Sequence, residues 1–284
     1  MASRSAVYQK SAAPARKKGG RWRALVEHPR FAWISTPVLV VIFIALWDLY
    51  AVVTDMSRFV LPRPKEVAVA FGEQITTPFI WTGHIWTTFY EIVFGLLLAC
   101  VLGIPLGFVI GKWQLLERMT RPFLVASQVV PMIALIPLFL LWFGFGSTSK
   151  IVIAALSAFF PFLINTAFGV RSIPKPLKEL MMSLKASQWE RFRKLELPYT
   201  LAYTMAGAQL AIVSATIGVI VGQYLGGNEG LGRYLVILQN DLQIARVFGA
   251  IIMIALLGFL LYSAVVAVNR ALVPWHDSVR NTRR

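Results

Sequence analysis

Long apolar runs alternate with short charged segments along this chain. A helix needs roughly 20 apolar residues to cross a hydrocarbon core about 30 Å thick. Six runs approach or exceed that length: Val38–Val53 (extended upstream by Phe31–Pro37), Ile85–Ile110, Pro122–Phe143, Ile151–Val170, Tyr199–Val221 and Val247–Val268. The pattern predicts an all-α membrane protein with six transmembrane helices, and no soluble domain of useful size is left over.

The composition supports a membrane protein, and the charge distribution predicts its orientation. The chain is 57% hydrophobic and 14% charged, with a net charge of +15. Of its 28 Lys and Arg residues, 22 fall on the side of the predicted spans that holds both termini, which leaves 6 on the other side. Because cytoplasmic loops carry the excess of Lys and Arg, we expect both termini in the cytoplasm. The basic charge is then a topology signal, which argues against a nucleic-acid partner.

The sequence offers little for catalysis, metal binding or a cofactor. Cys100 is the one cysteine, and the three histidines are far apart, so neither a disulfide framework nor a metal-ligand spacing exists. The segment Gly226–Gly232 resembles a phosphate-binding loop but lacks the closing Gly-Lys-Ser/Thr, and it falls on the outer side. We therefore expect a non-enzyme with no catalytic residue, no metal site and no cofactor.

The chain divides into three parts around the predicted spans. Residues 1–36 form a basic tail without the apolar core of a signal peptide, and we expect it to be disordered and held against anionic headgroups. Residues 37–270 form the transmembrane domain, and residues 271–284 form a cytoplasmic C-terminal tail.

Glycines and polar residues inside the spans suggest packing sites and a route for a solute. Gly103, Gly107 and Gly111 recur every four residues, a spacing that lets two helices approach closely in lipid. Asp48 and Glu91 lie near the outer ends of their spans, where a charge costs less than at mid-bilayer. Polar residues at depth either line a solute path or bond helix to helix; the candidates for the path are Gln128, Asn165, Ser214 and Thr216.

A basic, amphipathic insertion separates the fourth and fifth spans. Pro174 and Pro176 suit the start of a short helix. Ser187-Gln188-Trp189-Glu190 forms a capping box that starts a second one. Trp189, Phe192 and Leu195 recur every three residues on that helix, and we expect Pro198 to end it. Physical chemistry alone leaves two readings open, an interfacial anchor in the headgroups or a contact site for another protein.

This insertion resembles the cytoplasmic loop of ATP-binding-cassette importer permeases. The family pattern is Glu-Ala-Ala, three residues, Gly, nine residues, Ile, one residue, Leu-Pro. Glu179, Leu195 and Leu197-Pro198 match it, whereas Leu180-Met181 replace the alanines and Lys185 replaces the glycine. Glycine takes a left-handed turn at no steric cost and lysine does not, which leaves the geometry of the bend open.

Further segments extend the resemblance from Trp47 to His276 and make it more specific. The chain is similar to nitrate/sulfonate/taurine-type permeases, a subgroup that includes permeases for thiamin-pyrimidine precursors and riboflavin. The matching segments, in order, are Leu61–Val67, Leu102–Gly111, Pro137–Gly146, Phe159–Thr166, Gly230–Gly232 and Pro274–His276.

The resemblance implies a type I importer permease fold in a bacterial inner membrane. It also implies two ATPase subunits, an extracytoplasmic solute-binding protein and a second permease copy as partners. A small hydrophilic solute would be imported, either nitrate-, sulfonate- or taurine-like, or a thiamin-pyrimidine precursor or riboflavin. The loop at residues 174–198 would receive the ATPase; its candidate contact residues are Glu179, Lys185, Ala186, Ser187, Trp189, Arg191, Phe192, Leu195 and Pro198. A stand-alone secondary transporter and a membrane scaffold are the alternatives, but mid-membrane charges and inverted repeats, which a secondary transporter would favour, are missing from the sequence.

Overall fold

The computed structural model describes residues 29–129 and 132–274, and this part of the chain is helical, without a strand. Its elements are α2 (Pro29–Val53), α3 (Pro64–Thr76), a π-helical turn η1 (Ile80–Ile85), α4 (Trp86–Lys112), α5 (Gln114–Val129), α6 (Met132–Phe143), α7 (Ser147–Arg171), α8 (Lys175–Ser183), α9 (Gln188–Arg191), a second π-helical turn η2 (Phe192–Glu196), α10 (Leu197–Gly226), α11 (Leu231–Asn240) and α12 (Ile244–Leu272).

Helix α2 forms a unit separate from the rest of the chain, which runs from Ser57. It begins at Pro29, inside the tail predicted for residues 1–36, because the apolar run from Phe31 to Pro37 continues the helix upstream. The remainder of that tail, residues 1–28, lies outside the described residues, as do residues 275–284 of the predicted C-terminal tail.

Five of the described helices are long and apolar enough to cross a membrane: Ser35–Val53, Ile80–Lys112, Ser147–Arg171, Gln188–Gly226 and Ile244–Leu272. The predicted third span, Pro122–Phe143, is instead shared between α5 and α6, and neither qualifies alone. Helix α5 is described to Val129 and α6 from Met132, and residues 130–131 between them lie outside the described residues. The count of six spans and the cytoplasmic termini stay predictions.

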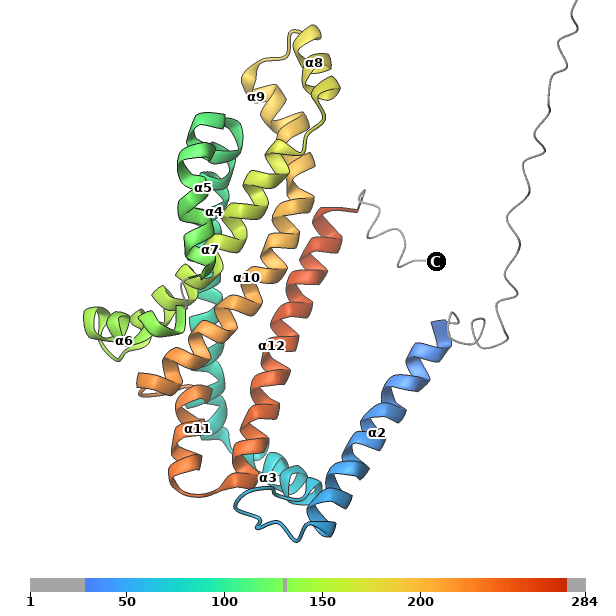
Figure 1. Cartoon of the computed structure of the whole chain (residues 1–284), viewed down its shortest axis with the longest axis vertical. Coiled ribbons are helices and arrows are strands. Elements are labelled where there is room, and N and C mark those ends of the chain that lie inside the picture. Colours follow the sequence, from blue (N-terminus) through green and yellow to red (C-terminus); the bar gives the residue numbers. More distant parts are fainter. Residues whose placement is uncertain (1–28, 130–131, 275–284) are drawn as a thin grey trace, which may run out of the picture. The chain divides into compact units, whose positions relative to one another are not determined.

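Helices α4, α7 and α10 pack along their lengths and form what we call the helix core (Figure 1). The glycine stripe of α4 faces α7, as its spacing predicts. A Cβ atom on Gly107 would lie 2.7 Å from the Cβ of Thr166 and 2.8 Å from the carbonyl oxygen of Leu163. Gly103 and Gly111 meet α7 in the same way, at Phe162 and Val170. The two backbones therefore approach as closely as glycine permits.

Helix α10 packs on the other side of α7 through small side chains. Ala154 and Ala158 of α7 and Ala208, Ala211 and Ala215 of α10 belong to one buried cluster, together with Ile92 and Val219. Gly207 of α10 lies against Asn165, where a Cβ atom would come within 2.8 Å of the Pro161 carbonyl oxygen. The close fit of all three helices makes the helix core one rigid body.

The two ends of the helix core carry different elements (Figure 1). Helices α8 and α9 lie at the end that the predicted orientation places inside the cell, which we call the inner end. Helices α3 and α11 lie at the outer end, where α3 packs on α12. Both helices are short, with 13 residues in α3 and 10 in α11.

Gly107→Ala should destabilise the protein, because its methyl group would overlap Thr166 and the Leu163 carbonyl. Overpacking of this kind costs about 1–3 kcal/mol, so the thermal unfolding midpoint of the purified protein in detergent should fall. Gly72→Ala in α3 is the matched control, because a Cβ atom there meets nothing within 4 Å. Equal midpoints for the two variants would show that the α4–α7 contact is looser than the structure has it.

Candidate functional sites at the two ends of the helix core

The loop at residues 174–198 connects α7 to α10, two of the three core helices. Its first helix, α8, begins after Pro174, which stands at the N-cap position and has a further proline, Pro176, in the first turn. None of the residues of α8, α9 or η2 is buried. The loop therefore presents nearly all its side chains to the surroundings.

The bend between α8 and α9 has the geometry that a glycine would favour. Lys185 adopts a left-handed conformation with φ 52°. Its N–H donates to the Met182 carbonyl at 2.9 Å, and the Ala186 N–H donates to the Met181 carbonyl at 3.0 Å. These two bonds form a Schellman motif, which ends a helix with a left-handed residue. Lys185, which replaces the glycine of the family pattern, thus adopts a conformation that costs a residue with a side chain roughly 1–2 kcal/mol.

The capping box predicted at Ser187 is confirmed. The Glu190 N–H donates to the Ser187 Oγ at 3.2 Å, and the Ser187 N–H donates to Glu190 Oε2 at 3.0 Å. Lys194 lies 3.2 Å from Glu190 Oε1, one helical turn further on. The turn before and the cap after Ala186 fix the path of the chain between the two helices.

The predicted break at Pro198 is wrong. One continuous helix runs from Gln188 to Gly226. It passes through the π-helical turn η2, in which the Leu197 N–H bonds to the Phe192 carbonyl, and Pro198 falls in the first turn of α10. The wider turn of a π-helix changes the hydrogen-bond register just before a residue that has no N–H to donate. The loop is therefore joined to α10 without a hinge.

Phe192 ties this helix to the inner end of α4. Its ring packs edge-on against Phe108 with centroids 5.4 Å apart, and the Lys112 ammonium lies 5.2 Å from its centroid. Lys112 also pairs with Glu196 at 2.6 Å. A further ion pair joins Arg171 at the end of α7 to Glu117 of α5. The base of the loop is thus bound to the helix core, and Phe192 is only partly available to a partner.

The loop exposes apolar side chains, one of which, Trp189, stacks on Phe192 with ring centroids 5.7 Å apart. Trp189 is 66% exposed and Leu184 is 68% exposed, although both are large hydrophobic residues. The other exposed apolar residues of the loop before α10 are Leu177, Leu180 and Met182. Of the remaining predicted contact residues, Glu179 is exposed, whereas Ala186, Arg191, Leu195 and Pro198 are half-buried.

The predicted path residues are scattered over different helix interfaces. Asn165 lies against Gly207 and donates to the Pro161 carbonyl of its own helix at 2.9 Å. Thr216 bonds back to the Ile212 carbonyl and lies near Gly258 of α12. Ser214 is half-buried on α10, and the side chain of Gln128 lies outside the described residues. Their role in a solute path stays a prediction.

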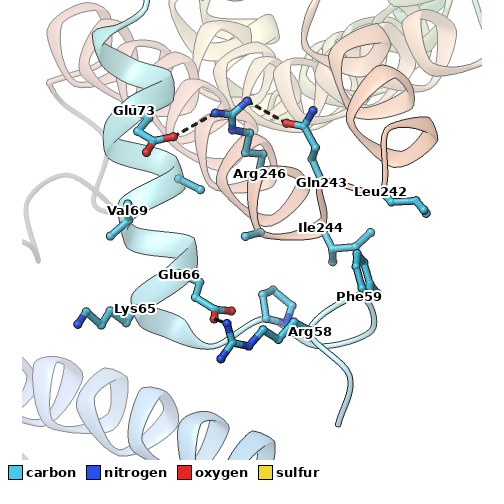
Figure 2. Close-up of a pocket in the computed structure, with 13 residues that line it drawn as sticks. Arg58, Phe59, Lys65, Glu66, Val69, Glu73, Leu242, Gln243, Ile244 and Arg246 are labelled. Carbon is cyan, nitrogen blue, oxygen red and sulfur yellow. Dashed lines mark hydrogen bonds and ion pairs between the residues drawn. The ribbon is translucent and has the colours of Figure 1, made fainter.

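A cleft of about 630 Å³ opens at the outer end, between α3 and the turn that joins α11 to α12 (Figure 2). Its rim holds the ion pairs Arg58–Glu66 at 3.2 Å and Arg246–Glu73 at 3.1 Å. Phe59, Val69 and Leu242 line it and are 67%, 55% and 63% exposed. Leu242 has φ 56°, so the turn holds an exposed leucine in a left-handed conformation. We call this site the outer cleft.

Sequence reasoning missed a buried polar network at the outer end of the helix core. Gln223 is fully buried, and its amide nitrogen donates to Glu91 Oε2 at 2.7 Å. Thr88 donates to Gln223 Oε1 at 3.1 Å. Lys150 is 1% exposed and donates to three backbone carbonyls. In the sequence, the one sign of this network is Lys150, a charged residue at the start of an apolar run. The partner of Glu91 could not be found because Gln223 lies far along the chain.

Within the described residues, His, Cys, Asp and Glu form no group that could hold a metal ion.

Comparison with known proteins identifies the family. Residues 103–274, which include most of the helix core and the whole loop, match the model of the binding-protein-dependent transport system inner membrane component. The chain belongs to this family. It is thus a transport subunit of the inner membrane rather than an enzyme.

The sequence of this permease matches those of curated relatives over most of its length. It is 33% identical to the putative aliphatic sulfonates transport permease of Bacillus subtilis, over 93% of this chain and 92% of that one. It is 33% identical to the riboflavin transport system permease of Chloroflexus aurantiacus, over 88% and 93%. It is 34% identical to the formylaminopyrimidine transport permease of Halalkalibacterium halodurans, over 81% and 91%.

A solved structure supports the type I importer fold. A chain of the MetNI methionine transporter, in an inward-facing conformation, superposes on this permease with a TM-score of 0.57 and 20% identity. The match covers 69% of this permease and 98% of that chain.

Replacing Lys185 with glycine should tighten the bend, because glycine takes the left-handed conformation without steric cost. A gain of about 1 kcal/mol corresponds to roughly five-fold slower exchange of the Ala186 amide, measured by hydrogen–deuterium exchange of the loop peptide. Lys185→Val should speed the same exchange, because a β-branched residue disfavours positive φ. Equal exchange in both variants would contradict the Schellman geometry.

Proposed function

We propose that this permease is the membrane-spanning subunit of an ATP-driven importer that moves a small hydrophilic solute inward by alternating access. The observation that carries the proposal is the loop at residues 174–198. It is fixed in shape by a Schellman motif and a capping box, bound at its base to the helix core, and apolar on its exposed side. A soluble partner that buries Trp189 and Leu184 gains hydrophobic contact area there.

The proposed partner at this loop is an ATPase subunit. Moving a two-state equilibrium from 1:99 to 99:1 takes about 5.5 kcal/mol of differential binding. The permease supplies no chemistry for this, so the free energy must enter through an interface with a chain that hydrolyses ATP. Large, exposed aromatic residues are frequent hot spots of such interfaces, and Trp189 is the most exposed aromatic side chain of the loop.

The helix core would carry the movement to the outer end. The loop is continuous with α10 and directly follows α7, and α7 packs closely on both α4 and α10 at glycines of those two helices. A displacement of the loop then moves the helix core as a unit. Alternating access needs a second body to move against, and we propose a second copy of this permease, with one ATPase for each copy.

At the outer end, we propose that a solute-binding protein docks at the outer cleft. The family is defined by its dependence on a binding protein. The outer cleft combines exposed apolar side chains, Phe59 and Leu242, with two charged pairs at its rim, a mixture suited to a protein partner rather than to lipid. The relatives are named for aliphatic sulfonates, riboflavin, formylaminopyrimidine, taurine and nitrate, so the proposed solute is a small hydrophilic compound of one of these kinds.

Trp189→Asp should abolish co-purification of the ATPase with the detergent-solubilised permease, because it places a charge in the proposed apolar contact. Since Trp189 is exposed, the variant should unfold at the wild-type temperature. Leu242→Asp, equally exposed but at the outer end, is the matched control and should retain the ATPase. If the ATPase still binds the Trp189 variant with wild-type affinity, the proposed coupling site is wrong. If the ATPase binds neither the wild-type permease nor any variant, the importer function is refuted.

Leu242→Asp with Phe59→Asp should remove stimulation of ATP hydrolysis by the solute-binding protein and leave the unstimulated rate unchanged. Two charges in the outer cleft weaken an apolar contact without touching the inner end. The assay uses the reconstituted complex titrated with the binding protein, and a loss of at least ten-fold in apparent affinity is expected for two disrupted contacts of about 1 kcal/mol each. Unchanged stimulation would place the binding protein elsewhere.

A further inference from the structure

A small polar pocket lies at the outer end of the helix core, beside the glycine-rich segment that joins α10 to α11. Its volume is about 190 Å³, room for a small organic group. It is lined mainly by Thr87, Glu91, Ser147, Lys150, Asn228 and Glu229. These residues come from the starts of α4 and α7 and from the glycine-rich segment. Ionisable groups buried in a membrane protein are costly, and they commonly mark a solute pathway.

The glycine-rich segment is held firmly over this pocket. The Leu231 N–H donates to Thr88 Oγ1 at 2.8 Å, and the Gly232 N–H donates to Gln223 Oε1 at 3.0 Å. Gly230 has φ 98°, and a Cβ atom there would lie 2.3 Å from the Gln223 side chain. The backbone is therefore fixed by the buried network, and it presents the exposed side chains of Asn228 and Glu229.

The charged groups of the pocket differ in what they can still bind. A lysine ammonium has three donors. Those of Lys150 go to the carbonyls of Phe145, Gly146 and Gly226, so little is left for an anion. The carboxylates retain acceptor capacity, because a carboxylate has about four lone-pair sites, whereas Glu91 accepts from Gln223 and Ser147 and Glu229 accepts from Thr87. With two carboxylates and one ammonium, the pocket has a formal net charge of −1.

We propose that this pocket is a solute subsite at the outer end of the transport path, and that it accepts solutes carrying an ammonium or amino group. Its free acceptors pair with N–H donors, and its net negative charge disfavours a simple oxyanion such as nitrate. The inference rests on the importer function proposed above. Both α7 and α10 run from the coupling loop to this pocket, so movement of the loop reaches it directly.

The sign of the charge at the pocket can be tested by comparing how fast a cationic and an anionic thiol reagent label a cysteine introduced there. Cys100 is the one native cysteine, so Cys100→Ala gives a cysteine-free background for Asn228→Cys. In membranes holding the complete complex, the cationic reagent MTSET should label this position about ten-fold faster than the anionic MTSES, relative to the same ratio at Val60→Cys. Val60 is an exposed outer position away from the pocket.

Variants that remove the negative charge of each carboxylate test whether the pocket causes the preference for MTSET. Glu91→Gln and Glu229→Gln should each lower the MTSET preference at Asn228→Cys towards the Val60→Cys value. Glu229 is exposed, so its variant keeps the test valid if Glu91→Gln disturbs the buried network. No labelling at Asn228→Cys, or a ratio equal to the reference before neutralisation, overturns the subsite.

The solute class has its own test. The purified cognate binding protein, screened by calorimetry with taurine, an aminopyrimidine and nitrate, should bind a compound with an amino group. Binding of nitrate alone overturns the proposed selectivity. Neither result depends on the ATPase: if the ATPase co-purifies and the labelling shows no charge bias, only the subsite is wrong, whereas a failure of the ATPase to bind refutes the importer itself.

Discussion

The rest of the structure depends on the near-contact of backbones between α4 and α7. In lipid, helices gain little from burying apolar surface, so association relies on van der Waals contact over closely fitted surfaces. Gly95, Gly103, Gly107 and Gly111 allow that fit along α4 from Gly95 to its inner end. Alanines extend it to α10. The loop at residues 174–198 is attached to one end of this closely packed body, and the polar pocket lies at the other.

Local patterns were enough to predict much of this arrangement. The four-residue glycine spacing indicated the α4 interface, and Ser187 with Glu190 indicated the capping box, because both depend on residues within one or two turns. The bend at Lys185 could not be predicted in the same way. Lysine has no intrinsic preference for a left-handed conformation, so only the hydrogen bonds of the finished turn reveal it.

Longer-range features were less accessible. Gln223 and Glu91 are far apart in the sequence, and their pairing depends on the register between α4 and α10, which no local pattern fixes. The predicted break at Pro198 was wrong, because the widened turn of η2 lets the helix continue past a proline.

The uninterrupted helix from Gln188 to Gly226 has 39 residues. At 1.5 Å per residue it measures about 58 Å, nearly twice the thickness of the hydrocarbon core. Trp189 lies ten residues, about 15 Å along the helix axis, before the predicted span Tyr199–Val221. A helix of this length can present the loop beyond the hydrocarbon core, and a small tilt of so long a helix produces a large displacement at its far end.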